Sequence, residues 1–289
     1  MIGIGLALLV AVLWSNGEIA YSKITKKYDR TNVYLYSFFI RTIIYLGVVL
    51  LFSRQLFGTF ELNVFQSTLP IILCDLFASL VVNIAVYNGK LSVVSPIMAA
   101  YPVLNIILGV LLLKEKATVI EIILVGLISL SIILLAMNQT KSDKAPNPLK
   151  GIIFSIFYML LAAFSIYFEK TIYNNSISMY DLYYYKGMIY LIASLTFSLI
   201  ILFSPIKLKK PSFDIIKGCG ITPIGNVIDS LALTMGNMLI ITPISSLYSV
   251  FTHYTSRFVL KEKIHWKEKI FIITILLSTL ILITINVLK

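Results

Sequence analysis

Apolar runs of about 20 residues follow one another along the whole chain, and charged residues or Pro, Gly and Asn separate them. A helix of that length crosses the roughly 30 Å hydrocarbon core of a bilayer. Cutting the chain at the polar breaks gives ten predicted spans: 2–22, 31–53, 69–88, 91–113, 117–138, 150–169, 180–203, 215–235, 238–260 and 267–288. The pattern therefore predicts an all-α integral membrane protein with ten transmembrane helices.

One stretch of the chain occurs twice. Residues 85–116 align without a gap on residues 232–263, an offset of 147 residues, with ten identities in 32 columns. The identical pairs include Gly89 and Gly236, Pro96 and Pro243, and Tyr101 and Tyr248, and both copies end in Lys-Glu-Lys. Shared apolar composition does not explain these fixed Gly, Pro and charged positions, so we predict two copies of one membrane unit.

The repeat predicts a first unit at 1–138, a linker at 139–149 and a second unit at 150–289. Pro146 and Pro148 prevent a continuous helix through the linker. Each unit has five predicted spans, and an odd number brings the second copy into the membrane from the opposite side. Two inverted five-helix repeats are typical of secondary transporters, which bind substrate between the repeats near mid-membrane.

The composition agrees with a membrane location. Mean hydropathy is +0.92, and only 13% of residues are charged, whereas a soluble domain has roughly twice that share. The net charge of +11 does not indicate nucleic-acid binding, because the basic residues lie in short loops beside anionic lipid headgroups. The predicted partners are a lipid bilayer and a small-molecule substrate, with no nucleic acid, and the chain is a monomer or homodimer. The sequence has no metal-binding or catalytic motif, so we predict no cofactor, no metal and no enzyme activity.

The loop charges also bear on orientation. With both termini cytoplasmic, the outside loops would carry sixteen Lys and Arg residues and the inside loops five. The positive-inside rule therefore predicts that both termini face outward.

Several motifs match a known family. Each repeat has a Pro in the first turn of its fourth helix and Lys-Glu-Lys where that helix ends. The stretch AVLWSNGEIAYSK at 11–23 combines a Trp, small residues and a Lys, and Arg41 lies in the second span. With ten helices in inverted units, this pattern resembles the drug/metabolite transporter superfamily, in particular its EamA-type members, over essentially the whole chain. The resemblance implies secondary transport of small metabolites without ATP in a prokaryotic cytoplasmic membrane. It also implies cytoplasmic termini, against the charge count.

The acidic candidates for the transport pathway are Glu18, Asp75 and Asp229, because each lies inside a predicted span and a charge in hydrocarbon is costly. Asp229 is nearest mid-membrane, where a desolvated carboxylate could take and release a proton and so couple transport to a gradient. Glu18 and Lys23 resemble a Glu and Lys of the small multidrug members of the superfamily, which implies a proton or cation site. A headgroup-level pair of Glu18 with Lys23 is the alternative. Glu18 lies near the end of its span and Asp75 near the start of its own, so we expect these two at opposite membrane faces.

Arg41 is the basic candidate near mid-membrane, because a guanidinium can hold a substrate carboxylate in a bidentate fork. A structural ion pair of Asp229 with Arg41 or Lys186 is the alternative for both charges. His253 titrates near physiological pH and shares a helix face with Arg257, so it is either a proton relay or a buried His with a structural hydrogen bond.

Aromatic residues and helix breaks complete the candidates. Trp14, Tyr101 and Tyr248 fall inside spans, and rings of this kind can stack an aromatic substrate or surround an organic cation, although each can also serve ordinary packing. The tyrosine run at 183–185 is predicted to lie at the membrane interface. Finally, we predict hinges or helix breaks at Pro96 and Pro243, and glycines that permit a tight turn at Gly89 and Gly236.

These features together predict a secondary active transporter of a small amphiphilic metabolite, of the amino acid or organic amine class, with alternating access around a central cavity. H+ and Na+ are both candidate coupling ions, and substrate exchange is the other option. The alternative class is a membrane-embedded flippase or enzyme acting on a lipid headgroup, which would need paired acids at one depth in a cleft open to lipid.

Overall fold

The computed structural model describes residues 2–53, 61–89, 91–138, 146–206, 208, 210–260 and 266–287. Within these residues the chain forms α-helices and no strand, which confirms the all-α prediction. The helices are α1 Ile2–Lys27, α2 Arg30–Ser53, α3 Leu62–Asn88, α4 Leu91–Met98, α5 Pro102–Leu111, α6 Val119–Asn138, α7 Pro148–Asn174, α8 Met179–Leu202, α9 Phe213–Met235, α10 Met238–Ser245, α11 Tyr248–Leu260 and α12 Trp266–Val287.

Six helical segments of the described chain are long and apolar enough to cross a membrane. They are α1, α2, α3, α7, α8 and the segment Val93–Leu111, which runs through α4 and α5. The 26 residues of α1 extend about 39 Å at 1.5 Å per residue, which exceeds the hydrocarbon thickness of a bilayer. Large apolar side chains such as Leu51 and Leu130 face outward, as expected for a surface in contact with lipid.

The fourth and ninth predicted spans are not single helices. Each consists of two shorter helices, α4 and α5 in one and α10 and α11 in the other. Pro96 and Pro243 lie inside α4 and α10, and each of these helices ends two residues after its proline. A proline removes a backbone donor and clashes with the preceding turn, which weakens the helix there. The bounds of α10 are those of α4 moved by 147 residues, the offset found in the sequence.

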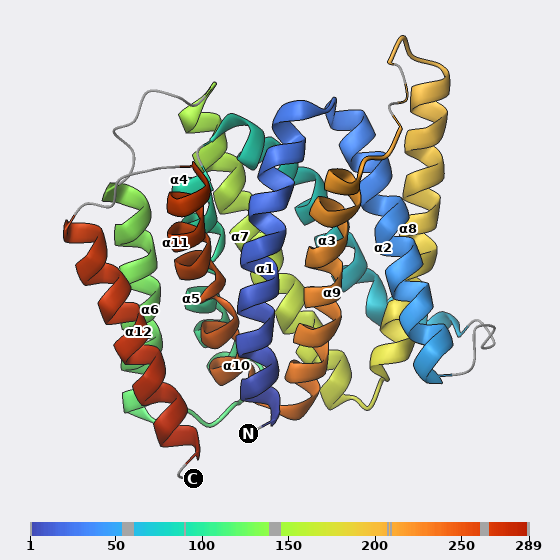
Figure 1. Ribbon diagram of the computed structural model, residues 1–289. Coiled ribbons are helices and arrows are strands. Elements are labelled where there is room, and N and C mark those ends of the chain that lie inside the picture. The colour runs from blue at the N-terminus through green and yellow to red at the C-terminus, as the bar shows by residue number, and fades with distance from the viewer. Residues whose placement is uncertain are drawn as a thin grey trace.

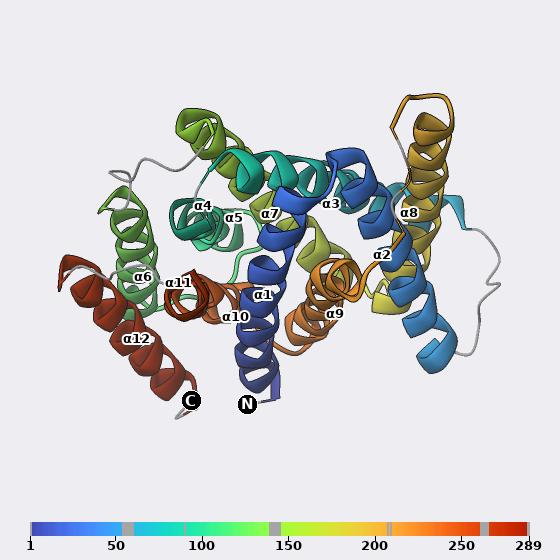
Figure 2. The same ribbon diagram turned by 45° about the horizontal axis from the view of Figure 1, so that its top comes forward.

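Helices of the first half pack mainly on helices of the second half. α1 packs against α9, α3 against α7, α2 against α8 and α6 against α12. The start of α1 and the end of α12 lie at the same end of the bundle (Figure 1). Seen from the tilted view, α6 and α12 form one edge and α2 and α8 the opposite edge, with α1, α3, α7 and α9 between them (Figure 2). The interior between these four central helices contains the polar residues considered next.

Gly89 and Gly236 have a different role from the predicted one. Their backbones are extended, with φ of −102° and −153°, a conformation that any residue can adopt. The turn therefore does not require glycine. A Cβ on Gly89 would meet Val94 and the backbone of Gly151, and one on Gly236 would meet Ile241. Close packing, rather than the turn, requires the small residue.

Candidate functional site

A polar cavity in two adjoining parts lies between the central helices. The Glu18 chamber is lined by Trp14, Glu18, Tyr21, Ser37, Arg41, Asp75, Ala78, Ser79, Val82, Val86, Tyr158, Gly218, Cys219, Thr222, Asn226 and Tyr248. The Asp229 chamber is lined by Trp14, Asp75, Ala78, Tyr101, Tyr158, Ala162, Ser165, Ile166, Glu169, Tyr183, Lys186, Asn226, Asp229, Ser230 and Tyr248. Each chamber offers about 80 Å³ to the centres of water-sized molecules, several times what one water needs. Shared lining residues, including Asp75 and Tyr158, show that the chambers adjoin.

Glu18 receives hydrogen bonds from both halves of the chain. Its Oε2 accepts from Ser95 Oγ on α4 at 2.5 Å and from Thr252 Oγ1 on α11 at 3.0 Å. Trp14, one helical turn earlier on α1, donates from Nε1 to Asn226 Oδ1 at 3.0 Å and packs edge-on against the Tyr248 ring. A carboxylate and two aromatic rings thus face the same chamber.

The prediction that Glu18 and Asp75 lie at opposite membrane faces is wrong. Both side chains line the Glu18 chamber. The error arose because the predicted spans stopped at polar residues near their ends, at 22 and 69, whereas α1 continues to Lys27 and α3 begins at Leu62. With the full helices, Asp75 is at the middle of α3 and Glu18 is more than two turns from the end of α1.

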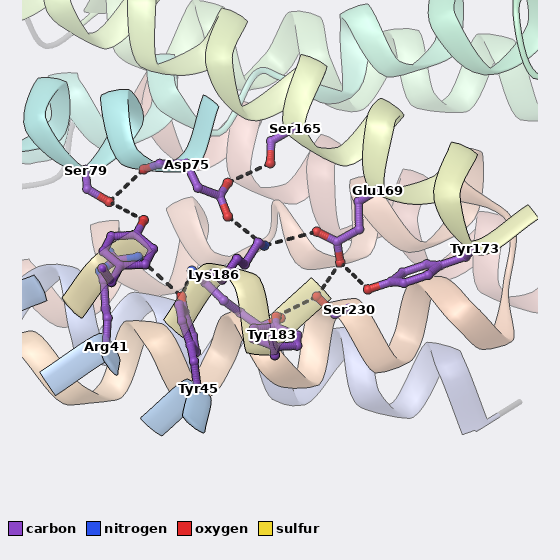
Figure 3. Close-up of polar contacts among 12 residues, drawn as sticks. Arg41, Tyr45, Asp75, Ser79, Ser165, Glu169, Tyr173, Tyr183, Lys186 and Ser230 are labelled. Carbon is purple, nitrogen blue, oxygen red and sulfur yellow. Dashed lines mark hydrogen bonds and ion pairs between the residues drawn. The ribbon is translucent and has the colours of Figure 1, made fainter. Parts of the chain in front are cut away.

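A buried ion network occupies the wall of the Asp229 chamber (Figure 3). Lys186 Nζ on α8 lies 2.6 Å from Asp75 Oδ2 on α3 and 3.5 Å from Glu169 Oε2 on α7. Asp75 Oδ1 also accepts a hydrogen bond from Ser165 Oγ at 2.6 Å. Glu169 Oε1 accepts from Tyr173 OH at 2.8 Å and from Ser230 Oγ. One ammonium therefore serves two carboxylates on two different helices.

Asp229 does not form either of the predicted ion pairs. Its Oδ1 accepts a hydrogen bond from Ser245 Oγ at 2.6 Å, and within the described residues it has no ion pair with Arg41 or Lys186. The side chain is 5% exposed and lines the chamber named after it. Asp229 is therefore a buried carboxylate with a hydroxyl as its partner.

Arg41 presents hydrogen-bond donors to the Glu18 chamber. The residue is 8% exposed, its Nη1 donates to Tyr45 OH at 3.4 Å, and its guanidinium lies 5.4 Å from the centre of the Tyr190 ring. Its Nε has no hydrogen-bond partner among the described residues. A guanidinium has five N–H donors, so this one has donors left for an anionic group in the chamber.

The other predicted residues divide into two groups. Tyr101 lines the Asp229 chamber, with its OH 3.4 Å from the carbonyl oxygen of Thr242, and Tyr248 lines both chambers. His253 is buried on α11 but is not part of either chamber lining. The side chain of Arg257 and the second Lys-Glu-Lys at 261–263 lie outside the described residues.

Sequence reasoning missed Glu169 and misplaced Tyr183. Glu169 was at the edge of the predicted span 150–169, but α7 continues to Asn174 and so places it inside the protein. Tyr183 is fully buried rather than interfacial, donates to the carbonyl oxygen of Asn226 at 2.9 Å and shares a hydrogen bond of 2.6 Å with Ser230. The opposite charges of Glu169 and Lys186 within apolar surroundings were the available signal.

The turn between α9 and α10 is held from two sides. Lys170 Nζ donates to the carbonyl oxygens of Leu233 at 2.9 Å and Gly236 at 2.8 Å, at the end of α9. The carboxylate of Glu115 accepts from the backbone N–H groups of Met238 at 3.1 Å and Leu239 at 3.2 Å, at the start of α10. Charges of these signs are favourable at those helix ends. The first Lys-Glu-Lys motif thus supplies a helix cap to the other half of the chain.

Comparison with known proteins agrees with this architecture. The model of the EamA-like transporter family matches residues 1–137. No curated protein sequence gives a significant match. A solved structure described as "Crystal structure of protein" has a TM-score of 0.71 and 13% sequence identity, with 96% of each chain covered, and so shares the fold. Members of the matched family are transporters rather than enzymes. The family match and the apolar helices of membrane length together indicate a multi-pass integral membrane protein. The matched family is part of the drug/metabolite transporter superfamily, so the unit at 1–137 is similar to that of an EamA-like transporter.

Proposed function

We propose that the protein is a secondary active transporter of a small amphiphilic metabolite, of the amino acid or organic amine class. The observation that carries this proposal is a cavity between the halves in which Glu18 and Arg41 line the same chamber. A zwitterion or a substituted amine with a ring has the charges and surface that such a chamber complements. Trp14, Tyr158 and Tyr248 supply aromatic faces for the apolar part.

We also propose ten membrane spans in two inverted repeats, with units at 1–138 and 150–289. Helix boundaries support this, because α1, α3, α4 and α6 moved by 147 residues fall on α7, α9, α10 and α12 within a few residues. Under that relation the α1–α9 contact and the α3–α7 contact are equivalents of each other, and both are extensive. Pseudo-symmetric packing around a central site is the architecture that alternating access requires.

Charge balance in the cavity favours a role for protons or substrate cations. The described lining has four acids, Glu18, Asp75, Glu169 and Asp229, and two bases, Arg41 and Lys186. Lys186 contacts two of the acids, whereas Glu18 and Asp229 have hydroxyl donors and, among the described residues, no cation as a partner. Buried carboxylates without a cation are costly. Each therefore takes a proton or meets the positive end of a substrate, and exchange between these states couples transport to a proton gradient.

Two repeat-related lysines support alternating access. Lys170 holds the α9–α10 turn, whereas Lys23, 147 residues earlier, is exposed and its side chain has no hydrogen bond or ion pair with a described residue. The lining of the Glu18 chamber reaches Tyr21 and Gly218, toward the end that carries Lys23. We infer that the end with the held turn is closed and that substrate enters from the other.

A stability screen followed by uptake tests the proposal. Purified protein is heated with amino acids, quaternary amines and nucleotide-like metabolites, because a ligand that binds only the folded state raises Tm. Uptake of the best ligand into proteoliposomes should fall at least tenfold in Glu18→Gln. Asp181→Asn is the control, because Asp181 is an exposed acid in the first turn of α8. Equal uptake by both variants would contradict the assigned role of Glu18.

The lipid-headgroup alternative requires paired acids at one depth, and Glu18 and Asp75 line one chamber. Flux of a water-soluble ligand into sealed vesicles separates the two classes. A headgroup enzyme would modify the lipid, and a flippase would move the lipid between leaflets. Either one would leave the vesicle lumen free of the labelled ligand.

A further inference from the structure

Lys186 is placed where a transporter could bind an inorganic cation. Its ammonium lies between carboxylates of α3 and α7, 2.6 Å from Asp75 and 3.5 Å from Glu169, and 5.1 Å from the centre of the Tyr183 ring (Figure 3). The side chain is 2% exposed. Two carboxylates from different helices together with an aromatic face form a site that is complementary to one monovalent cation.

Hydroxyl groups orient the carboxylates of Asp75 and Glu169, and a bound ion would require carboxylates oriented in this way. Asp75 is oriented by Ser165, and Glu169 is oriented by Tyr173 and Ser230. The hydroxyls donate to Asp75 Oδ1 and Glu169 Oε1. The other oxygen of each carboxylate, which faces Lys186, is therefore oriented independently of the ammonium. Two carboxylate oxygens held in fixed positions around a positive charge form a preorganised cation-binding site.

We propose that Lys186 is a tethered cation, which permanently occupies a site that would otherwise bind Na+ or K+. The inference deepens the proposed transport function, because it assigns the coupling ion: with this position filled, transport does not require Na+, and coupling falls to the protonatable acids Glu18 and Asp229. The folded protein is likewise stable without any particular monovalent cation.

Removing the ammonium opens the site. Lys186→Met keeps the length and apolar stem of the side chain but leaves Asp75 and Glu169 facing each other without a positive charge. Uncompensated buried charge is strongly destabilising. A monovalent cation that enters the vacancy restores the balance, and binding to the folded state alone raises Tm.

The test compares Tm at pH 8 in equal concentrations of NaCl, KCl and choline chloride. Wild type should have the same Tm in all three salts. In choline chloride, Lys186→Met should have a lower Tm than wild type. Saturating Na+ or K+ should raise the Tm of Lys186→Met by at least about 2–4 °C. Lys23→Met, which removes an exposed lysine of the same type, should behave as wild type.

A second variant separates charge balance from packing. Lys186→Met combined with Asp75→Asn removes one carboxylate along with the ammonium, so its Tm should no longer respond to Na+ or K+. The proposal would be overturned if the Tm of Lys186→Met were the same in all three salts. It would also be overturned if Lys186→Met folded in none of them. A wild-type Tm that rises specifically with Na+ or K+ would also overturn it, because the site would then not be filled.

These stability measurements do not depend on finding a substrate. Absence of any transport would therefore contradict the proposed function and leave the tethered-cation result standing. Transport by wild type that stops when Na+ is replaced by choline would contradict the coupling assignment.

Discussion

Lys170→Met should open the end of the protein that holds the α9–α10 turn. The substitution removes two hydrogen bonds from an ammonium to the carbonyl oxygens of Leu233 and Gly236, while the methionine keeps the apolar stem. Hydrogen bonds to a charged group contribute about 1.5–3 kcal/mol each when buried. Lys170 is only partly buried, so water replaces much of this, and we expect a net loss of about 1–2 kcal/mol for the pair. The ratio of closed to open forms should then fall by about 5- to 30-fold.

The reporter is a single cysteine at Ala162, which lines the Asp229 chamber, in a background with Cys74 and Cys219 replaced by Ala. A membrane-impermeant thiol reagent is applied to proteoliposomes from the side where α1 begins. Labelling of the cysteine should be faster in Lys170→Met by the same factor of about 5–30.

Lys23→Met is the matched control for this experiment. It removes the repeat-equivalent lysine, whose side chain has no hydrogen bond or ion pair with a described residue, and so should not speed labelling from that side. Equal labelling rates in wild type and Lys170→Met would show that the turn is closed by packing alone and would refute the role given to Lys170.

Two further predictions concern the cavity and the packing of the halves. Arg41→Gln should weaken the binding of ligands that have a carboxylate by about tenfold or more and leave amines without a carboxylate unaffected, because a buried charge-assisted pair is lost; equal loss for both ligand sets, in a titration followed by Tm, would contradict this. Gly151→Ala should lower Tm by about 2–6 °C, because its Cβ would meet the backbone of Gly89, whereas Gly126→Ala, whose Cβ meets nothing within 4 Å, should not lower it, and a harmless Gly151→Ala would refute the close approach.

The sequence pattern predicted the helical fold well, because it depends on local information. Apolar runs of membrane length identify helices without knowledge of their partners. The offset of 147 residues, read from the sequence, relates α4 to α10 in the structure, and Pro96 and Pro243 indicated the helix breaks. Helix ends were less predictable, because helices continue through polar residues that a hydropathy criterion excludes.

The candidate site was predicted only in part, because ion pairs depend on how distant helices pack. Asp75 was a candidate, but its partner Lys186 was considered only as one of two alternative partners of Asp229, and Glu169 was omitted. A sequence shows that a charge is buried without showing which charge faces it. The error in the depth of Glu18 and Asp75 has the same origin as the error in helix ends, because depth was counted from them.

The most direct test of the central claim is proton movement driven by the ligand. Proteoliposomes that contain a pH-sensitive dye are exposed to a gradient of the amino acid or amine that gives the largest Tm increase. Wild type should change the luminal pH, and Asp229→Asn should transport the ligand without that change. Wild-type vesicles that take up no more ligand than protein-free vesicles, for every compound in the screen, would contradict the account.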